Sequence, residues 1–583
     1  MYKLKKLIDS LANKPYSQIQ QLTGNFQFSR YQFQFLKIQG SPGANPASIA
    51  SLKIDMGVSE LPPEFLSSVY CRVAVADFLI RRFKRGIDKF AQQNRGKEGS
   101  GSFYTIELSQ KMLERDSVLF SERDIELRFI FSLPGKGRGG GLFDGQQAWL
   151  MFTQELALIV DYSLYYKDYS PATKKQLAEY LEVQINRQAI KDYMLHKGYI
   201  VFIANGAHLP RRSGIDDRPA EKGAIICFQS PKTLLVDIPL ANHCSIQGMA
   251  LKAGVTCITG GGYHGKSTLL QAILAGVYAH IPGDGREYIV TRDDAVFIRA
   301  EEGRSIQHVD ISPFIGLLPN GINTQQFSSE NASGSTSQAA SIVESLEFGS
   351  RLLLFDEDTC ASNFLFRDSL IEKVLGSANE PIKPLYSVVR SMWQQHGISM
   401  IFVVGGLGSF LQKADTCLLM DNYQCKDIST KVRRVLGEIA GESTEPLHFS
   451  APRQLMADNF PPAYINYRLK KEVPIRIKPL RNAPKQLEYG LDLINLEALP
   501  QIVEAPQILS VGYCLLRIRY ALQNSADKAQ TMNDCLRWLY QKLDQQGLSF
   551  LQPEYPGNLS MPRKQEVAAA INRIRSLKVI IND

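Results

Sequence analysis

The sequence predicts an α/β protein with a central, mainly parallel sheet. Between about residues 175 and 445, apolar runs of strand length alternate with segments of helical periodicity, a pattern that favours a parallel sheet covered by helices. Short strand-like runs mix with helices before this region, and a proline-rich passage follows it. We therefore expect an N-terminal α+β accessory domain at 1–160, the α/β domain at 161–450, a basic linker at 451–485 and a small C-terminal accessory domain at 486–583.

The composition excludes several classes of protein. No window of the 583 residues approaches the roughly 18 to 20 apolar residues of a membrane helix, and the start of the chain lacks the apolar core of a secretory signal. The nine cysteines form no Cys-x-x-Cys pair and the eight histidines are scattered, which argues against a zinc site or a disulfide framework. We expect a cytoplasmic protein with reduced thiols, no membrane segment and no metal beyond nucleotide-bound Mg²⁺.

A phosphate-binding loop is the strongest motif of the chain. Residues 260–268 match the pattern G-x-x-x-x-G-K-[ST], with an apolar strand-like run before them and a helix-like run after them. The glycines let backbone N–H groups face a polyphosphate, and the helix adds the positive end of its dipole. Lys266 is predicted to reach the β- and γ-phosphates, and Ser267 to ligate Mg²⁺. The predicted nucleotide contacts are Gly260, Gly261, Gly262, Tyr263, His264, Gly265, Lys266, Ser267 and Thr268.

An acidic pair follows a second apolar strand. The run Leu352–Phe355 ends in Asp356 and Glu357. A carboxylate at the end of such a strand lies beside the phosphate loop, where Asp356 would hold Mg²⁺ through water. Glu357 is the candidate general base that polarises the attacking water, and with Lys266 it makes up the predicted catalytic pair. Alone, the stretch is equally typical of an acidic surface turn; together with the loop it predicts an ATPase or GTPase.

A small-residue turn lies between these two motifs. Ser333, Gly334 and Ser335 stand at the start of a predicted helix, and Ser333 precedes Asp356 by 23 residues. We call these three residues the Ser-Gly-Ser turn. Backbone N–H groups at a helix start form an anion site, so the turn is a second candidate nucleotide contact. A serine-rich loop with an ordinary helix N-cap is the structural alternative.

These motifs resemble those of predicted ABC-class ATPases that are not transporters. The matching stretches include residues 260–268, 281–287, 332–338 and 355–359, and coverage is strong from about 200 to 450. The resemblance implies a P-loop NTPase core of the ABC ATPase type with ATP and Mg²⁺ as ligands. It also implies a head-to-tail homodimer, in which the Ser-Gly-Ser turn completes the nucleotide site of the other subunit.

The chain departs from transporter ATPases after the strand that follows the acidic pair. Transporter ATPases carry a switch histidine there, whereas this chain reads Ile401-Phe-Val-Val-Gly-Gly-Leu-Gly-Ser. The γ-phosphate sensor is therefore either replaced or absent.

A basic segment suggests a second ligand. Residues 464–485 hold seven cations against Glu472, which gives +6 of the formal net charge of +8. Tyr464 and Tyr467 are interleaved with them, so the segment is suited to track a nucleic acid backbone and stack on bases. A solvated linker is equally compatible. A second run, Arg81–Arg85, is typical of a solvated helix face, with nucleic-acid contact as the alternative. The predicted RNA or DNA contacts are Arg468, Lys470, Lys471, Arg476 and Lys478.

Three classes of function are compatible with these motifs. The first is an ATP hydrolase that couples dimer closure and opening to the binding or remodelling of RNA or DNA. The second is an ATPase that acts on protein assemblies. The third is a nucleotide-dependent binding module with little turnover, which the missing histidine favours. ATP turnover measured with and without nucleic acid distinguishes the three.

Overall fold

The chain folds into two compact units. The computed structural model describes residues 1–581, apart from residues 42–47, 93–94, 96–99, 138–139, 222–224, 242–243, 319–320, 368–379, 438–445, 481–482 and 555. Unit 1 comprises Met1–Ile185 and Gln546–Met561, and unit 2 comprises Asn186–Gln545 and Pro562–Asp583. The polypeptide therefore passes between the units three times, at residues 185–186, 545–546 and 561–562.

Unit 1 is built on an antiparallel sheet with the strand order β1-β2-β3-β7-β4, and β6 also pairs with β7. Every second residue of β7 is buried, as expected for a strand with one face toward a core. Helix α3 packs against α5, and α6 leaves the unit. The elements are α1 (Tyr2–Leu11), β1 (Gly24–Gln27), β2 (Gln32–Lys37), β3 (Ser48–Asp55), α3 (Val69–Phe90), β4 (Phe103–Tyr104), β6 (Val118–Phe120), β7 (Asp124–Phe131), α4 (Gly145–Leu150), α5 (Leu156–Ser163) and α6 (Pro171–Lys197).

The basic run Arg81–Arg85 lies on α3 and is only partly solvated. Arg81 donates to the buried carboxylate of Asp77 over 2.6 Å. The guanidinium of Arg82 is buried and lies 4.0 Å from the centre of the Tyr162 ring. Lys84 and Arg85 are exposed. Two of the four cations therefore contribute to packing within unit 1.

A segment from near the C-terminus completes unit 1. Asp116 is buried, and its two carboxylate oxygens accept the N–H groups of Gly557 and Leu559 over 2.6 and 2.7 Å. A side chain at Gly557 would place its Cβ 2.7 Å from the Cβ of Arg128, so the segment approaches the sheet too closely for a larger residue. Residues 546–561 are therefore an integral part of this unit.

The burial of Asp116 predicts a pH dependence of stability. Burial raises the pKa of this carboxyl from 3.8 to about 6, although the two N–H donors and Arg128 act in the opposite direction. The folded state thus holds the proton more tightly than the unfolded state, so this group's contribution to the free energy of unfolding should fall as pH rises from about 4 to about 6. Denaturant titrations of wild type and Asp116→Asn at pH 4 and pH 7 measure the effect. The difference between the two proteins should change by roughly 2–3 kcal/mol; an identical pH dependence would contradict the assignment.

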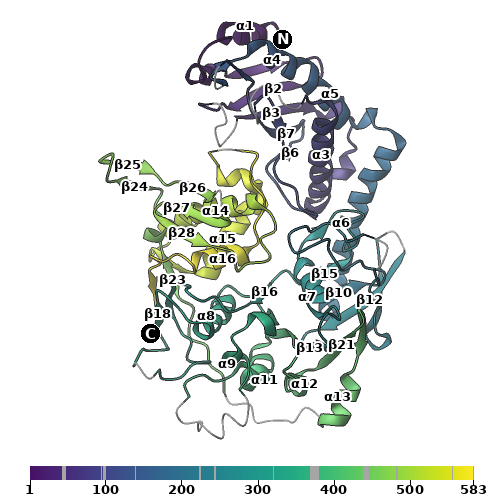
Figure 1. The fold of residues 1–583 in the computed structure, drawn as a ribbon, viewed down its shortest axis with the longest axis vertical. Helices are drawn as coiled ribbons and strands as arrows, with labels where there is room; N and C mark the ends of the chain where they lie inside the picture. Colours follow the sequence, from purple (N-terminus) through teal and green to yellow (C-terminus); the bar gives the residue numbers. More distant parts are fainter. Residues whose placement is uncertain are drawn as a thin grey trace. The chain divides into compact units, whose positions relative to one another are not determined.

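The core of unit 2 is a sheet of order β16-β19-β20-β13-β21-β22, parallel except for β22. It confirms the predicted α/β core with a mainly parallel sheet, and Figure 1 shows helices such as α7 and α8 around it. Strands β19 and β20 are buried along their whole length, as in sheets covered on both faces. The elements are β13 (Val255–Gly260), α7 (Lys266–Ala275), β16 (Ala295–Ile298), α8 (Gly334–Glu347), β19 (Leu352–Asp356), α11 (Leu385–His396), β20 (Ser399–Val403), β21 (Thr416–Asp421), β22 (Gln424–Asp427) and α13 (Ser429–Leu436).

Smaller sheets of unit 2 include one of order β11-β12-β10-β15 and one of order β29-β23-β30. Another has the order β26-β27-β28 and lies beside α14. The residues from 451 to 485, expected as a linker, hold the hairpin β24–β25 and the first strand of the latter sheet. The elements are β10 (Tyr199–Ala204), β11 (Leu235–Pro239), β12 (Ser245–Lys252), β15 (Ile289–Thr291), β23 (Gln454–Met456), β24 (Ala463–Asn466), β25 (Lys471–Pro474), β26 (Ile477–Leu480), β27 (Ala483–Tyr489), β28 (Asp492–Asn495), α14 (Ala505–Asn524), β29 (Ala529–Thr531), α15 (Met532–Gln546), α16 (Lys564–Ile571) and β30 (Val579–Ile580).

Candidate nucleotide site

The loop 260–268 connects a central strand to a helix. β13 ends at Gly260, and Lys266, Ser267 and Thr268 form the first turn of α7. The intervening loop is Gly261, Gly262, Tyr263, His264 and Gly265. Gly260 and Gly265 have φ angles of +144° and +98°, and a Cβ at Gly260 would lie 2.2 Å from the carbonyl oxygen of Met420. Only glycine fits at Gly260, because both the conformation and the neighbouring strand exclude a side chain.

Lys266 places its charge across this loop. Its ammonium donates to the carbonyl oxygens of Gly260 and Gly261, each over 2.8 Å. Tyr263 lies at the outer edge of the loop with a φ of +62° and a side chain that is 97% exposed. The loop is therefore open to solvent at Tyr263, whereas the lysine is held against the start of the loop.

The turn of the β21–β22 hairpin supports the loop. The backbone N–H of Asn422 donates to Nδ1 of His264 over 3.0 Å, and the N–H of Tyr423 donates to the carbonyl of His264 over 3.2 Å. In the first bond the ring nitrogen Nδ1 is the acceptor, which holds the imidazole against the hairpin turn. Asn422 and Tyr423 both have positive φ, as in a tight hairpin turn. Sequence reasoning missed these residues; the Asp421-Asn-Tyr-Gln run after a buried strand is the signal that identifies them.

The acidic pair ends strand β19, and β20 lies between β19 and β13. Asp356 is 8% exposed. Burial raises the pKa of its carboxyl, assisted by the charges of Asp358 and Glu357 and opposed by the N–H of Asp358 and by Lys266. A buried carboxylate with a raised pKa is stabilised by a cation, so the position suits a metal ligand.

Glu357 contacts the turn after β20. Its Oε2 accepts the backbone N–H groups of Gly405 over 2.6 Å and of Gly406 over 3.1 Å. A Cβ at Gly405 would lie 3.9 Å from both Glu357 Oε2 and Lys266 Nζ. Lys266 and Glu357, which are 91 residues apart in the chain, therefore meet at Gly405.

The Ser-Gly-Ser turn begins α8. Ser333 is the N-cap, and its hydroxyl accepts the N–H of Thr336 over 3.4 Å. A Cβ at Gly334 would lie 3.3 Å from that of Ala300 and 3.5 Å from that of Ala361. Ser335, the last residue of the turn, is buried. Within the described residues, no hydrogen bond or ion pair joins the turn to the loop 260–268.

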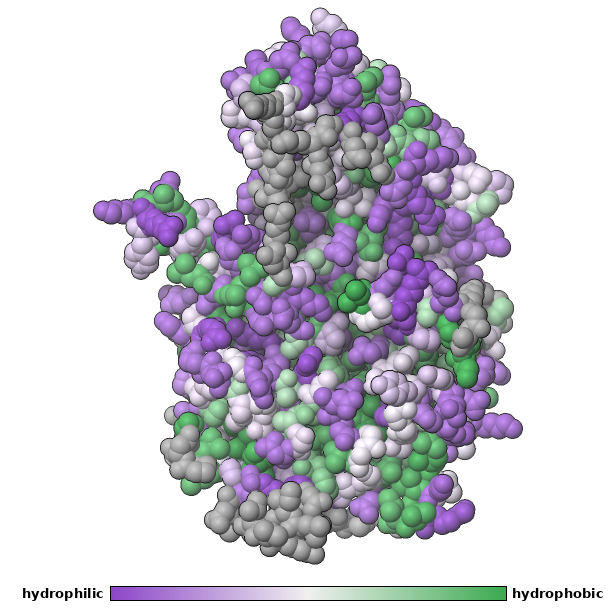
Figure 2. Space-filling model, in the orientation of Figure 1, coloured by the Kyte–Doolittle hydropathy of each residue, from purple (hydrophilic) through white to green (hydrophobic). Residues whose placement is uncertain are grey.

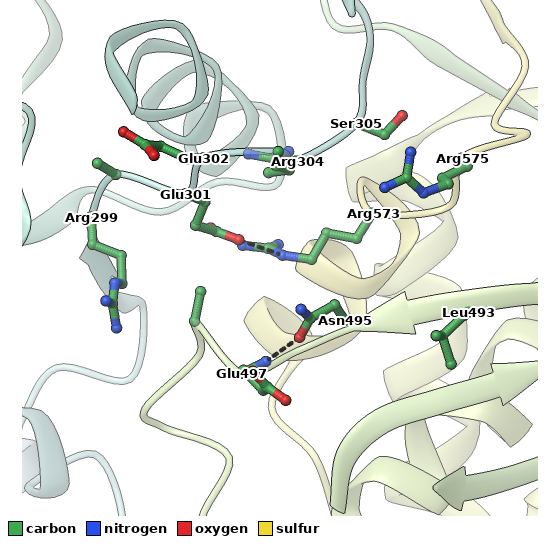
Figure 3. A pocket seen from close by; sticks show the side chains of 13 residues that line it. Arg299, Glu301, Glu302, Arg304, Ser305, Leu493, Asn495, Glu497, Arg573 and Arg575 are labelled. Carbon is green, nitrogen blue, oxygen red and sulfur yellow. Dashed lines mark hydrogen bonds and ion pairs between the residues drawn. The ribbon is translucent and has the colours of Figure 1, made fainter. Parts of the chain in front are cut away.

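A cavity of about 520 Å³ is lined by the segment that contacts this turn. Residues 299–305 form one wall: the N–H of Glu301 donates to Ser337 Oγ, and that of Ala300 donates to the carbonyl of Thr359 after the acidic pair. Figure 3 shows the ion pair of Glu301 with Arg573 among the side chains that line the cavity. The pair joins Arg573, which follows helix α16, to the segment 299–305. That segment in turn contacts α8, which begins at the Ser-Gly-Ser turn, and Thr359 after the acidic pair.

Oxygen donors suited to Mg²⁺ are present at the site. The hydroxyl of Ser267 and the buried carboxylate of Asp356 are the hard ligands that this ion takes, and nucleotide phosphates usually supply others. Across the described ranges, no three or more His, Cys, Asp and Glu residues cluster as a self-sufficient metal site. The same ranges contain no helix with the length and apolar character needed to cross a membrane.

Known proteins resemble parts of this chain. An uncharacterized protein of Methanocaldococcus jannaschii, MJ1628, is 30% identical over 264 residues, which cover 43% of this chain and 57% of that protein. The match thus spans little more than half of the relative's length. Two solved structures are similar at low identity. CbiO1 from Clostridium perfringens, part of the ABC transporter complex cbiONQ, is 14% identical with a TM-score of 0.22, over 41% of this chain and 92% of that one. The ADP conformation of MJ1267, an ATP-binding cassette of an ABC transporter, is 13% identical with a TM-score of 0.24, over 42% and 96%.

Three family models match successive parts of the chain. The P-loop domain of the ABC ATPases matches residues 173–453, the N-terminal domain of ABC-class ATPases matches 1–167, and the MRB1590 C-terminal domain matches 481–580. The first of these confirms the predicted P-loop core of the ABC type. Since two models that describe ABC-class ATPases account for residues 1–167 and 173–453, the chain belongs to the ABC-class ATPase family.

Proposed function

We propose that the protein hydrolyses ATP at the loop 260–268 and couples this reaction to a nucleic acid. The meeting of Lys266 and Glu357 at Gly405 carries the proposal, since it puts a cation and a carboxylate together at the ends of parallel strands. Phosphoryl transfer depends mainly on such positioning and on charge stabilisation.

The residues divide the reaction between them. Lys266 would exchange its two carbonyl bonds for the β- and γ-phosphates, because bonds to an anion are stronger than bonds to a neutral carbonyl. Glu357 would accept one proton from water as the water oxygen bonds to the γ-phosphorus. The bond from that phosphorus to the β–γ bridging oxygen breaks, which yields ADP and inorganic phosphate. Ser267 and Asp356 would hold Mg²⁺, which supplies positive charge to the phosphates when bound.

The Ser-Gly-Ser turn supports a head-to-tail homodimer. Each chain has one phosphate loop and one such turn, and no contact between them is observed among the described residues. A second copy would therefore supply the turn that faces the γ-phosphate. Sedimentation of Glu357→Gln at saturating ATP tests this arrangement: a dimer is expected, and a monomer with tightly bound ATP would exclude it.

The hairpin β24–β25 is the proposed contact for nucleic acid. Arg468, Lys470 and Lys471 lie at or beside its tip, are exposed and make no ion pair or side-chain hydrogen bond to described residues. Tyr467 at the tip is 84% exposed. The hairpin extends from the rest of the C-terminal part in Figure 1, and Figure 2 shows hydrophilic residues at its end. Three free cations beside an exposed aromatic ring suit phosphate contacts and base stacking.

The other cations of this basic segment are less available. Arg476 and Lys478 share the carboxylate of Glu488 over 3.7 and 3.4 Å. Lys485 is partly buried, donates to the carbonyl of Leu499, and burial lowers the pKa of its ammonium. Arg481 lies outside the described residues. The proposed phosphate contacts therefore reduce to those of the hairpin.

Replacing the three hairpin cations with glutamine should weaken binding across sequences and flatten its salt dependence. Three phosphate contacts give a logarithmic salt slope of about −2.7 on duplex DNA and about −2.1 on single strands. Arg476→Gln with Lys478→Gln is the matched control and should change the slope less, because Glu488 already offsets those charges. Fluorescence anisotropy with RNA and DNA at several salt concentrations measures both. An unchanged affinity and slope in the hairpin variant would favour a protein partner.

ATP turnover with and without nucleic acid tests the function as a whole. Stimulation by RNA, single-stranded DNA or duplex DNA is expected, and it should disappear in the hairpin variant. Tight ATP binding without turnover under every condition would instead identify a nucleotide-dependent binding module.

A further inference from the structure

We propose that the Gly405–Gly406 turn positions the carboxylate of Glu357 through two backbone N–H groups, where transporter ATPases carry a histidine side chain. The inference rests on the proposed role of Glu357 as the general base. Gly405 and Gly406 have no side chains that could orient this base, so their backbone N–H groups would do so.

The turn is fixed to the sheet directly before it reaches Glu357. Val404 donates its N–H to the carbonyl of Ile258 on the strand that leads to the phosphate loop, over 2.9 Å. The next two N–H groups, those of Gly405 and Gly406, both point to Glu357 Oε2. Because the strand fixes the backbone, these donors cannot rotate away as a side chain can. They are therefore preorganised donors at a defined distance from the phosphate loop.

The two oxygens of Glu357 have different surroundings. Oε2 accepts both N–H groups, whereas Oε1 accepts no hydrogen bond from the residues that the structure describes. Anchoring one oxygen leaves the other available to take a proton from water. The arrangement thus fixes the orientation of the base without occupying its reactive oxygen.

Glycine at these positions keeps the space beside Lys266 open. A Cβ at Gly405 would enter the region between Glu357 Oε2 and Lys266 Nζ, at 3.9 Å from each. A Cβ at Gly406 would lie 3.3 Å from Glu357 Oε1, closer than an ordinary contact. The γ-phosphate and the attacking water need this space, so small residues and backbone donors serve where a larger side chain would obstruct.

Two substitutions remove different parts of this arrangement. Gly405→Pro deletes the N–H that makes the shorter bond, and Gly406→Ala crowds Oε1 while keeping both N–H groups. We expect kcat for ATP hydrolysis to fall about 10- to 100-fold in Gly405→Pro and about 3- to 10-fold in Gly406→Ala. These losses are smaller than the roughly 10²–10⁴-fold contribution of a general base, because the carboxylate itself remains. KM for ATP should change less than about threefold, because the phosphate loop is unaltered.

Matched variants separate positioning from folding. Gly408→Ala adds a methyl group in the same turn, in open space away from Glu357, and should keep wild-type turnover. Gly405→Ala adds a Cβ at the same place but retains the N–H, so it should lose part of the turnover and still be at least about five times faster than Gly405→Pro. An unchanged KM for ATP in Gly405→Pro separates this difference from a folding defect. Equal losses in Gly408→Ala and Gly406→Ala would overturn the proposal.

A double-mutant cycle and amide exchange complete the test. If the turn acts through Glu357, adding Gly405→Pro to Glu357→Gln should not lower the single-turnover rate further. In Glu357→Ala, hydrogen exchange at the amides of 405 and 406 should accelerate relative to wild type, whether or not the protein hydrolyses ATP. Wild-type kcat in Gly405→Pro, with Glu357→Gln inactive, would reject the turn but keep the base. Full turnover by Glu357→Gln would reject the base itself.

Discussion

Glu357→Gln is expected to bind ATP and lose turnover by about 10²–10⁴-fold, the range of a general base. The amide keeps the shape of the side chain and a carbonyl oxygen for the N–H groups of Gly405 and Gly406. It has no basic oxygen to take a proton from water. Equilibrium binding of ATP and single-turnover hydrolysis measure the two steps separately, and the variant should accumulate bound, unhydrolysed ATP.

Asp358→Asn is the matched control for this substitution. It removes the same charge one residue further along the chain, from an exposed side chain. Its turnover should stay close to that of the wild type. Hydrolysis by Glu357→Gln at the rate of Asp358→Asn would remove Glu357 from the role of base.

Asp284→Ala is expected to cause the largest loss of stability, about 3–5 kcal/mol, as for other buried ion pairs that lose one partner. The carboxylate of Asp284 is fully buried, receives two hydrogen bonds from the Arg211 guanidinium over 2.7 and 3.0 Å, and contacts His280 Nδ1 over 2.6 Å. The alanine leaves the largely buried Arg211 with only Asp217 as a counter-ion, which is partly exposed and lies 3.7 Å away. His280 lies shortly after helix α7, which starts at Lys266. The loss of stability should therefore also weaken the structure of the nucleotide site.

Thermal unfolding with and without ATP measures this effect. Asp216→Ala, which breaks the exposed pair of Asp216 with Arg218, is the control and should leave the midpoint unchanged. A wild-type midpoint in Asp284→Ala would show that the network adds no stability.

Local sequence patterns predicted the central sheet and the strand–loop–helix arrangement around Lys266. The spacing of apolar residues and glycines contains this information, since each element is set by neighbours within a few residues. Ser333 is the N-cap of α8, as expected if the Ser-Gly-Ser turn were an ordinary serine-rich helix start. An N-cap still leaves N–H groups free for an anion, so its proposed contact with nucleotide stays a prediction.

Contacts between distant strands could not be predicted in this way. Glu357 meets Gly405 because β20 lies between β19 and β13, and no periodicity within either strand encodes that order. The partners of Arg476 and Lys478 were equally hidden, because Glu488 faces them from the next strand of a hairpin. Charge counted along the sequence therefore overstated the cations available for a phosphate backbone.

The return of residues 546–561 to unit 1 limits how the protein can be divided for experiments. A fragment that ends at residue 185 lacks the N–H groups of Gly557 and Leu559, so Asp116 loses both donors. A fragment that starts at residue 186 keeps that segment but exposes Leu548, Leu551 and Leu559, which are buried in the whole chain. Either fragment is expected to aggregate or unfold for reasons unrelated to ATP. Coexpression of both fragments, which supplies residues 546–561 to unit 1 from a separate chain, is the sounder starting point for dissection.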